Sequence, residues 1–182
     1  MPNNKSEVKW WIDRYPFLRI EDVDDGCWLD SLPQGWVDTF GEQMCDDLME
    51  ALGDYAREWE IIQVKEKYGA MRLYHNGCPK EISNNVESII DKYSYISQFV
   101  CTLCGSIDAQ LYDDGWVQPW CDKCFEEIVL DRYGKFGLDK DKFKVYGKFD
   151  PIYEIRRFAD GCITTVIVDV SNEWERLKNC LK

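Results

Sequence analysis

The sequence predicts an α+β fold, because helical and strand-like patterns interleave along its 182 residues. Two segments, residues 39–59 and 80–98, place apolar side chains three or four positions apart, which is the spacing of one helix face. Shorter segments between and after them, at residues 61–65, 70–74 and 109–118, have the composition of strands. Hydrophobic residues form 45% of the chain, which is enough for a folded core.

The first predicted helix, residues 39–59, carries a single apolar stripe made of Phe40, Met44, Leu48, Leu52 and Tyr55. We expect Asp38 or Thr39 to cap its N-terminus, since both side chains can accept a hydrogen bond from a free backbone N–H. The preceding residues 10–33 mix aromatic, proline and acidic residues without a clear period. We therefore expect that segment to wrap irregularly around the core.

A β-hairpin is predicted next, with its turn at Lys67-Tyr68-Gly69. Its alternation places four residues in positions to face the core, namely Ile62, Val64, Met71 and Leu73. The second helix, residues 80–98, leads to the following cysteines without a Gly/Ser/Pro-rich spacer. We expect the cysteine region to pack on this helix–hairpin–helix platform.

Two C-x-x-C pairs, Cys101/Cys104 and Cys121/Cys124, are separated by sixteen residues. Four thiolates at this spacing can occupy the corners of a tetrahedron around one structural Zn²⁺ ion per chain. Four thiolates also leave no open position for water or substrate, so a structural role is favoured over a catalytic one. Disulfides and a thioredoxin-like redox motif fit the two pairs less well, whereas an iron–sulfur cluster remains an alternative.

The residues around these pairs predict how the site is built. Gly105 can take the positive φ of a tight knuckle after Cys104. Residues 109–118 form a short hairpin with its turn at Asp113-Asp114-Gly115, and the last two cysteines then open a helix. The order of knuckle, hairpin and helix resembles the treble-clef type of zinc finger. We expect the remaining cysteines to be core residues or exposed thiols: Cys27, Cys45, Cys78, Cys162 and Cys180.

Charge is distributed unevenly along the chain, whose net charge is −12. Residues 1–60 hold five Lys/Arg against fifteen Asp/Glu, so most of the acidity lies in this first third. Such a surface disfavours wholesale binding of nucleic acid. It is either a solvated face or a surface that docks on a basic partner. The absence of a long apolar run and of a secretion signal predicts a cytoplasmic protein without membrane contact.

The C-terminal part changes character, because basic and aromatic residues interleave over residues 132–157. This pattern can bind phosphates and stack on bases, or it can belong to strands whose lysines remain in water. Candidate nucleic-acid or anion contacts there are Lys135, Lys142, Lys144, Lys148, Arg156 and Arg157. A third hairpin is predicted at residues 152–158 and 162–170, followed by a helix capped by Ser171.

A second basic cluster, Lys65, Lys67 and Arg72, lies on the first hairpin and can bind an anion. Cross-strand pairing with Glu66 or Glu60 is the simpler interpretation of these charges. For enzymatic function, His75 is the only histidine and is expected to be a surface residue rather than a base. Clustered carboxylates leave an enzyme as a further alternative, although no catalytic motif is present.

Part of the chain, roughly residues 10–125, resembles a group of small bacterial and phage or prophage proteins. The resemblance centres on the string QVKEKYGAMRLY at residues 63–74, placed before the two C-x-x-C pairs. Further matching residues lie at 35–36, 40–45 and 115–116. The resemblance implies a phage-associated or mobile-element setting and a bound zinc ion, but no activity.

Together these patterns predict three regions, which we expect to form one body. They are an acidic α+β region (1–100), a four-cysteine zinc unit (101–133) and a C-terminal strand–strand–helix extension (134–182). We expect a non-catalytic, zinc-stabilised protein that binds a host protein with a basic surface. The alternatives are a nucleic-acid-binding zinc protein and an enzyme that uses clustered carboxylates.

Overall fold

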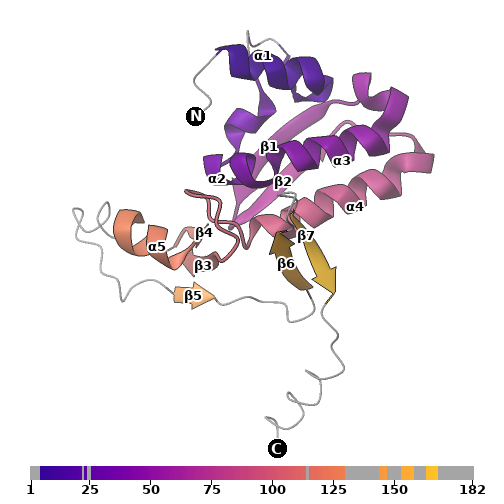
Figure 1. Cartoon of the computed structure of the whole chain (residues 1–182). Coiled ribbons are helices and arrows are strands. Elements are labelled where there is room, and N and C mark those ends of the chain that lie inside the picture. Colours follow the sequence, from indigo (N-terminus) through magenta and orange to yellow (C-terminus); the bar gives the residue numbers. More distant parts are fainter. Residues whose placement is uncertain are drawn as a thin grey trace, which may run out of the picture.

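The computed structural model describes residues 5–21, 23, 26–113, 115–129, 144–146, 153–157 and 163–167. Helices and strands interleave in these residues, which confirms the α+β class (Figure 1). The α-helices are α1 (Lys5–Arg14), α2 (Gln34–Trp36), α3 (Glu42–Leu52), α4 (Lys80–Ser97) and α5 (Asp122–Cys124). Short 3₁₀ segments are η1 (Pro16–Leu18), η2 (Trp28–Ser31) and η4 (Gly53–Arg57), and π-helical segments are η3 (Val37–Gly41) and η5 (Phe125–Val129).

The strands of the described residues form three small antiparallel sheets. The strands are β1 (Ile61–Lys67), β2 (Ala70–His75), β3 (Gln110–Asp113), β4 (Val117–Trp120), β5 (Lys144–Tyr146), β6 (Tyr153–Arg157) and β7 (Ile163–Ile167). They pair in the orders β1-β2, β4-β3-β5 and β6-β7. The predicted C-terminal hairpin is thus present as β6 and β7, whereas its turn and the helix predicted from Ser171 lie outside the described residues.

The first predicted helix begins earlier, ends earlier and is less regular than expected, because it starts at Gln34 as α2 and continues through η3 and α3 only to Leu52. Pro33 immediately precedes it, which suits a residue that cannot donate a backbone hydrogen bond. The predicted caps are therefore wrong. Asp38 instead accepts a hydrogen bond from Gln34 Nε2 at 2.6 Å, and Thr39 Oγ1 donates to the carbonyl of Gly105 at 2.9 Å. At the other end α3 stops at Gly53, whose φ is 54°.

The N-terminal segment is more ordered than predicted, since α1 extends to Arg14 and η1 and η2 follow. Val8 and Ile12 are buried on one face of α1. Arg14 forms ion pairs with Glu42 at 2.8 Å and Asp46 at 3.0 Å, which hold α1 against α3. The aromatic residues around α1 concealed the helical periodicity of this segment.

The predicted β1–β2 hairpin is present, and its two turn residues, Tyr68 and Gly69, have φ values of 55° and 77°. Positive φ at both positions is the signature of a type I′ turn, whose twist matches that of paired strands. Val64, Met71 and Leu73 are buried as expected, but the prediction for Ile62 is wrong, since 60% of this residue is exposed. An irregularity between Ile61 and Gln63 shifts the register, so that Ile61 is buried instead.

Helix α4 closely matches the predicted residues 80–98, and it lies beside α3 and the β1–β2 hairpin (Figure 1). Trp36, Phe40 and Tyr93 are buried in the core that these elements share, with the rings of Phe40 and Tyr93 stacked at 5.6 Å. The Tyr93 hydroxyl donates to Asp47 Oδ2 at 2.7 Å, and Lys92 pairs with the same oxygen at 2.8 Å. Within the described residues, no helix has the length and apolarity needed to cross a membrane.

Candidate metal centre

The first cysteine pair lies in a tight loop that directly follows α4. Gly105 has a φ of 73°, as predicted for a knuckle, and its N–H donates to the Cys101 carbonyl at 3.0 Å. The N–H of Cys101 donates in turn to the carbonyl of Ser106 at 2.8 Å. These two bonds close the loop and turn both cysteine side chains toward the same region.

The second pair lies where the β3–β4 hairpin ends and α5 begins, in agreement with the prediction. Cys121 is the N-cap of α5, and its Sγ accepts a hydrogen bond from the Cys124 N–H at 3.5 Å. The Cys121 carbonyl accepts a bond from the Phe125 N–H at 2.9 Å, so the helical turn itself fixes the spacing of the two sulfurs. Gly115, at the tip of the hairpin, has the positive φ of 107° that the turn requires.

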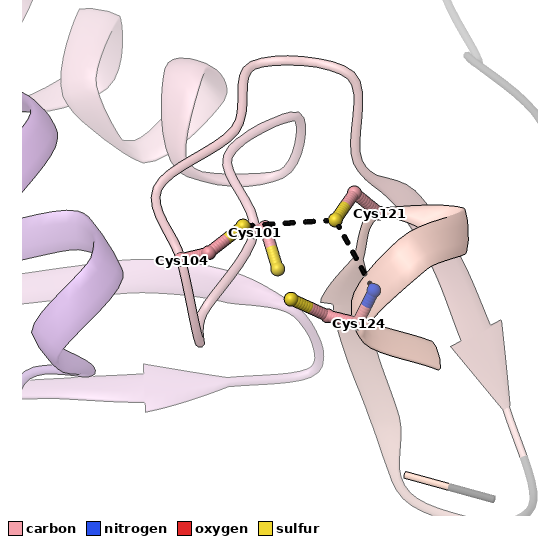
Figure 2. A group of neighbouring side chains, drawn as sticks. All are labelled: Cys101, Cys104, Cys121 and Cys124. Atoms are coloured by element: carbon pink, nitrogen blue, oxygen red, sulfur yellow. Dashed lines mark hydrogen bonds between the residues drawn. The ribbon is translucent and has the colours of Figure 1, made fainter. Parts of the chain in front are cut away.

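The structure brings all four sulfurs together, within 4.8 Å of one another (Figure 2). Cys104 Sγ and Cys121 Sγ are 3.6 Å apart, far beyond the roughly 2.05 Å of a disulfide bond. A tetrahedral ion with metal–sulfur bonds of about 2.3 Å would place its sulfurs about 3.8 Å apart. The four side chains could therefore hold a metal ion with little rearrangement. Cys101, Cys121 and Cys124 are buried, and Cys104 is exposed.

A small separate core supports the second cysteine pair. It consists of Tyr112, Trp120, Phe125 and their buried neighbours, and the rings of Tyr112 and Phe125 stack at 4.0 Å. The Tyr112 hydroxyl also donates to Asp122 Oδ1 at 2.9 Å. Burial and this nearby carboxylate both raise the pKa of Tyr112, so the hydroxyl keeps the proton that it donates. These contacts join the hairpin to the helix beside the second cysteine pair.

The knuckle is joined to the main core by contacts that sequence reasoning did not identify. The Gly35 N–H donates to the Thr102 carbonyl at 3.1 Å, and buried Trp36 Nε1 donates to the Val100 carbonyl at 2.8 Å. A Cβ atom on Gly35 would lie only 2.2 Å from the Cys101 carbonyl oxygen. Gly69 plays a similar role against the β3–β4 hairpin, where an added Cβ would lie 2.7 Å from Leu111 Cδ2. Both glycines permit close approach of two chain segments.

The protonation of the cysteine thiols depends on whether a cation is bound among them. Burial raises the pKa of the Cys121 and Cys124 thiols, and interactions with the neighbouring sulfurs raise the pKa of Cys124 further. Burial also acts to raise the pKa of Cys104, but hydrogen bonds from the Ser106 N–H and the other cysteines outweigh it, and that pKa is lowered. Without an ion the Cys121 and Cys124 thiols therefore retain their protons at neutral pH, and a divalent cation would displace them.

This proton competition predicts a steep pH dependence of metal affinity. Because raised pKa values keep the Cys121 and Cys124 thiols protonated, acidification should weaken binding, and alkalinisation should strengthen it. With Zn²⁺ as the probe, we expect the apparent dissociation constant to rise about tenfold or more for each pH unit below neutrality. Competition with a chromogenic zinc chelator measures this constant. An affinity that stays constant over about two pH units would contradict thiolate ligation.

The other predicted contacts are distributed differently. Lys65, Lys67 and Arg72 lie together on the β1–β2 hairpin. The expected pairing with Glu66 or Glu60 is wrong, since Glu66 accepts a bond from the Gly69 N–H and Glu60 accepts one from Asn76. Of the C-terminal candidates, Lys144 is exposed on β5 and Arg156 and Arg157 lie on β6. Lys135, Lys142 and Lys148 lie outside the described residues.

His75 is not the surface residue that the sequence suggested, since only 9% of its side chain is exposed. Its ring lies 5.1 Å from that of Trp59. Nδ1 accepts a bond from the Gly77 N–H at 3.0 Å, and Nε2 lies 3.0 Å from Glu87 Oε1. Both ring nitrogens therefore have partners within the fold, which favours a structural role for this histidine.

Comparisons with known proteins identify no relative. No protein-family model matches the chain, and neither curated proteins nor solved structures include a match. The function of this chain must therefore be inferred from the geometry of the cysteine cluster and from the surfaces around it.

Proposed function

We propose that this chain is a non-catalytic, zinc-stabilised protein that binds a protein partner with a basic surface. The observation that carries the proposal is the convergence of four cysteine sulfurs within 4.8 Å. Soft thiolate ligands in a tetrahedral set favour Zn²⁺, and such a set leaves no coordination position for substrate. The order of knuckle, hairpin and helix supports a treble-clef-like unit. An iron–sulfur cluster would make the purified protein coloured, whereas a zinc protein is colourless.

The acidic region provides the docking surface in this proposal. Glu42, Asp46 and Glu50 recur every four residues along α3, and Asp38 lies one turn before them. All four side chains are exposed, and Arg14 is the one described cation paired with any of them. Like charges at this spacing destabilise an isolated helix. Their concentration on one face therefore favours a role in attracting a basic surface.

The resemblance to phage and prophage proteins suggests where such a partner would be found. In a phage or mobile-element setting the partner is a protein of the bacterial host. Electrostatic complementarity of this kind mainly raises the association rate and weakens as salt increases.

Capture from nuclease-treated host lysate tests the docking surface. The variant Asp38→Asn/Glu50→Gln/Asp54→Asn removes three exposed carboxylates from the α2–α3 face and its continuation in η4. Glu81→Gln/Asp108→Asn/Glu127→Gln removes three exposed carboxylates elsewhere and so gives the same change in net charge. We expect wild type and the second variant to retain the same host protein, and the first variant to lose it. Equal retention by both variants would contradict docking through this face.

A further inference from the structure

The outer face of the β1–β2 hairpin concentrates positive charge that the fold does not neutralise. The register places Lys65 directly opposite Arg72, and Lys67 follows two residues along β1. Like charges in directly opposed positions destabilise a sheet. Among the described residues, no carboxylate lies within ion-pair distance of these three side chains. Repulsion between these cations therefore destabilises the hairpin, and a bound anion would relieve that repulsion.

Two exposed tyrosines accompany these charges. Tyr74 is 46% exposed and Tyr68 is 72% exposed. Lys65 Nζ lies 5.5 Å from the ring centroid of Tyr74, and Lys67 Nζ lies 5.4 Å from that of Tyr68. Each aromatic ring is thus next to a cation. Cation–π contacts at exposed sites are weak, at about 0.5–1 kcal/mol, so a ligand can displace them.

The side chain of Arg72 is positioned by hydrogen bonds within the fold. Its Nη1 donates to Ser94 Oγ at 2.7 Å and to the Met71 carbonyl at 3.2 Å, which fixes the guanidinium between β2 and α4. These bonds use one of its nitrogens and leave other N–H donors for an anion. Arg72 and Tyr74 also line a groove of about 620 Å³ between the two elements. Glu87 and Asp91 line the groove from α4, so an anion would bind on the hairpin side.

We propose that this face, defined by Lys65, Lys67, Tyr68, Arg72 and Tyr74, binds single-stranded nucleic acid. The three cations contact consecutive phosphates, and the two tyrosines stack on unpaired bases. A single strand is favoured over a duplex because its unstacked bases can reach exposed aromatic rings. The net charge of −12 repels nucleic acid at a distance. At physiological salt, however, screening confines this repulsion to about 8 Å. The groups that contact the strand then determine the affinity. This face is separate from the acidic face of α3.

Fluorescence anisotropy with a labelled oligothymidylate of about fifteen nucleotides tests the proposal. For three phosphate contacts on a single strand, we expect affinity to fall about 20-fold between about 50 mM and about 200 mM salt. Lys65→Gln/Lys67→Gln should weaken binding at the lower salt by at least about tenfold and should reduce the salt dependence. Tyr74→Leu should weaken binding without changing that salt dependence, since it removes stacking and no charge.

The matched control is Lys9→Gln/Lys80→Gln, which changes two exposed lysines elsewhere and gives the same net charge. It should bind as the wild type does. The double hairpin variant leaves Arg72 and its structural bonds intact, and circular dichroism verifies that it remains folded. No oligonucleotide binding at about 50 mM salt, or equal losses in the two lysine variants, would overturn the proposal. Binding of polyglutamate with no binding of oligothymidylate would assign the face to acidic proteins and would also overturn it.

Discussion

Replacing Cys124 by serine should abolish stoichiometric zinc binding and unfold the region around the cysteine cluster. Structural zinc contributes on the order of 10 kcal/mol of apparent folding free energy in small modules, which is comparable to the whole stability of a typical domain. Three remaining thiolates and a hydroxyl form a much poorer site for this ion. Elemental analysis of the purified variant and thermal unfolding followed by circular dichroism measure the two effects.

Cys78→Ser is the matched control, since Cys78 is a half-buried free cysteine that does not belong to the cluster. It should retain one zinc ion per chain and should unfold close to the wild-type temperature. Chelator added to the wild type should reproduce the behaviour of Cys124→Ser. A Cys124→Ser protein that still carries stoichiometric metal would refute the ligand assignment. Loss of metal with unchanged melting would refute the structural role.

Gly35→Ala should destabilise the protein by roughly 3 kcal/mol, an unusually large effect for the addition of one methyl group. The new Cβ would lie 2.2 Å from the Cys101 carbonyl oxygen and 2.7 Å from the Gly105 nitrogen. Both are backbone atoms of the loop that carries the first cysteine pair, so relief requires this loop to move away from α2. That movement would also strain the hydrogen bond from Trp36 Nε1 to Val100.

Gly41→Ala provides the contrast on the same helical segment. Gly41 has helical dihedral angles, and its nearest contact for an added Cβ is Val37 Cγ1 at 3.4 Å. The substitution should therefore stabilise the protein by about 0.5–1 kcal/mol, because alanine loses less backbone entropy on folding. Urea denaturation of both variants measures the difference. Similar free energies of unfolding for the two variants would show that close approach at Gly35 is unimportant.

Local patterns in the sequence predicted much of this fold and most of the candidate site. Helix α4, the β1–β2 turn and the positions of Gly105 and Gly115 depend on interactions within a few residues, and these are visible in the sequence. The same holds for the cysteines, because each pair is positioned by a single turn of backbone.

The features that were missed depend on contacts between distant segments. The side chain of Thr39 bonds to Gly105 rather than capping a helix, because the helical segment already begins at Gln34. Ile62 is exposed because a bulge turns it away from the core. The role of Gly35 is defined by a loop that follows it by more than sixty positions. No local periodicity encodes such contacts.

The hydrogen bonds from Gly35, Trp36 and Thr39 to the knuckle have a consequence for regulation. They join the loop of residues 101–105 to the segment from which the acidic helix α3 continues. Under the function that we propose, losing the ion would loosen the attachment of that helix, so binding of the partner would depend on the bound ion.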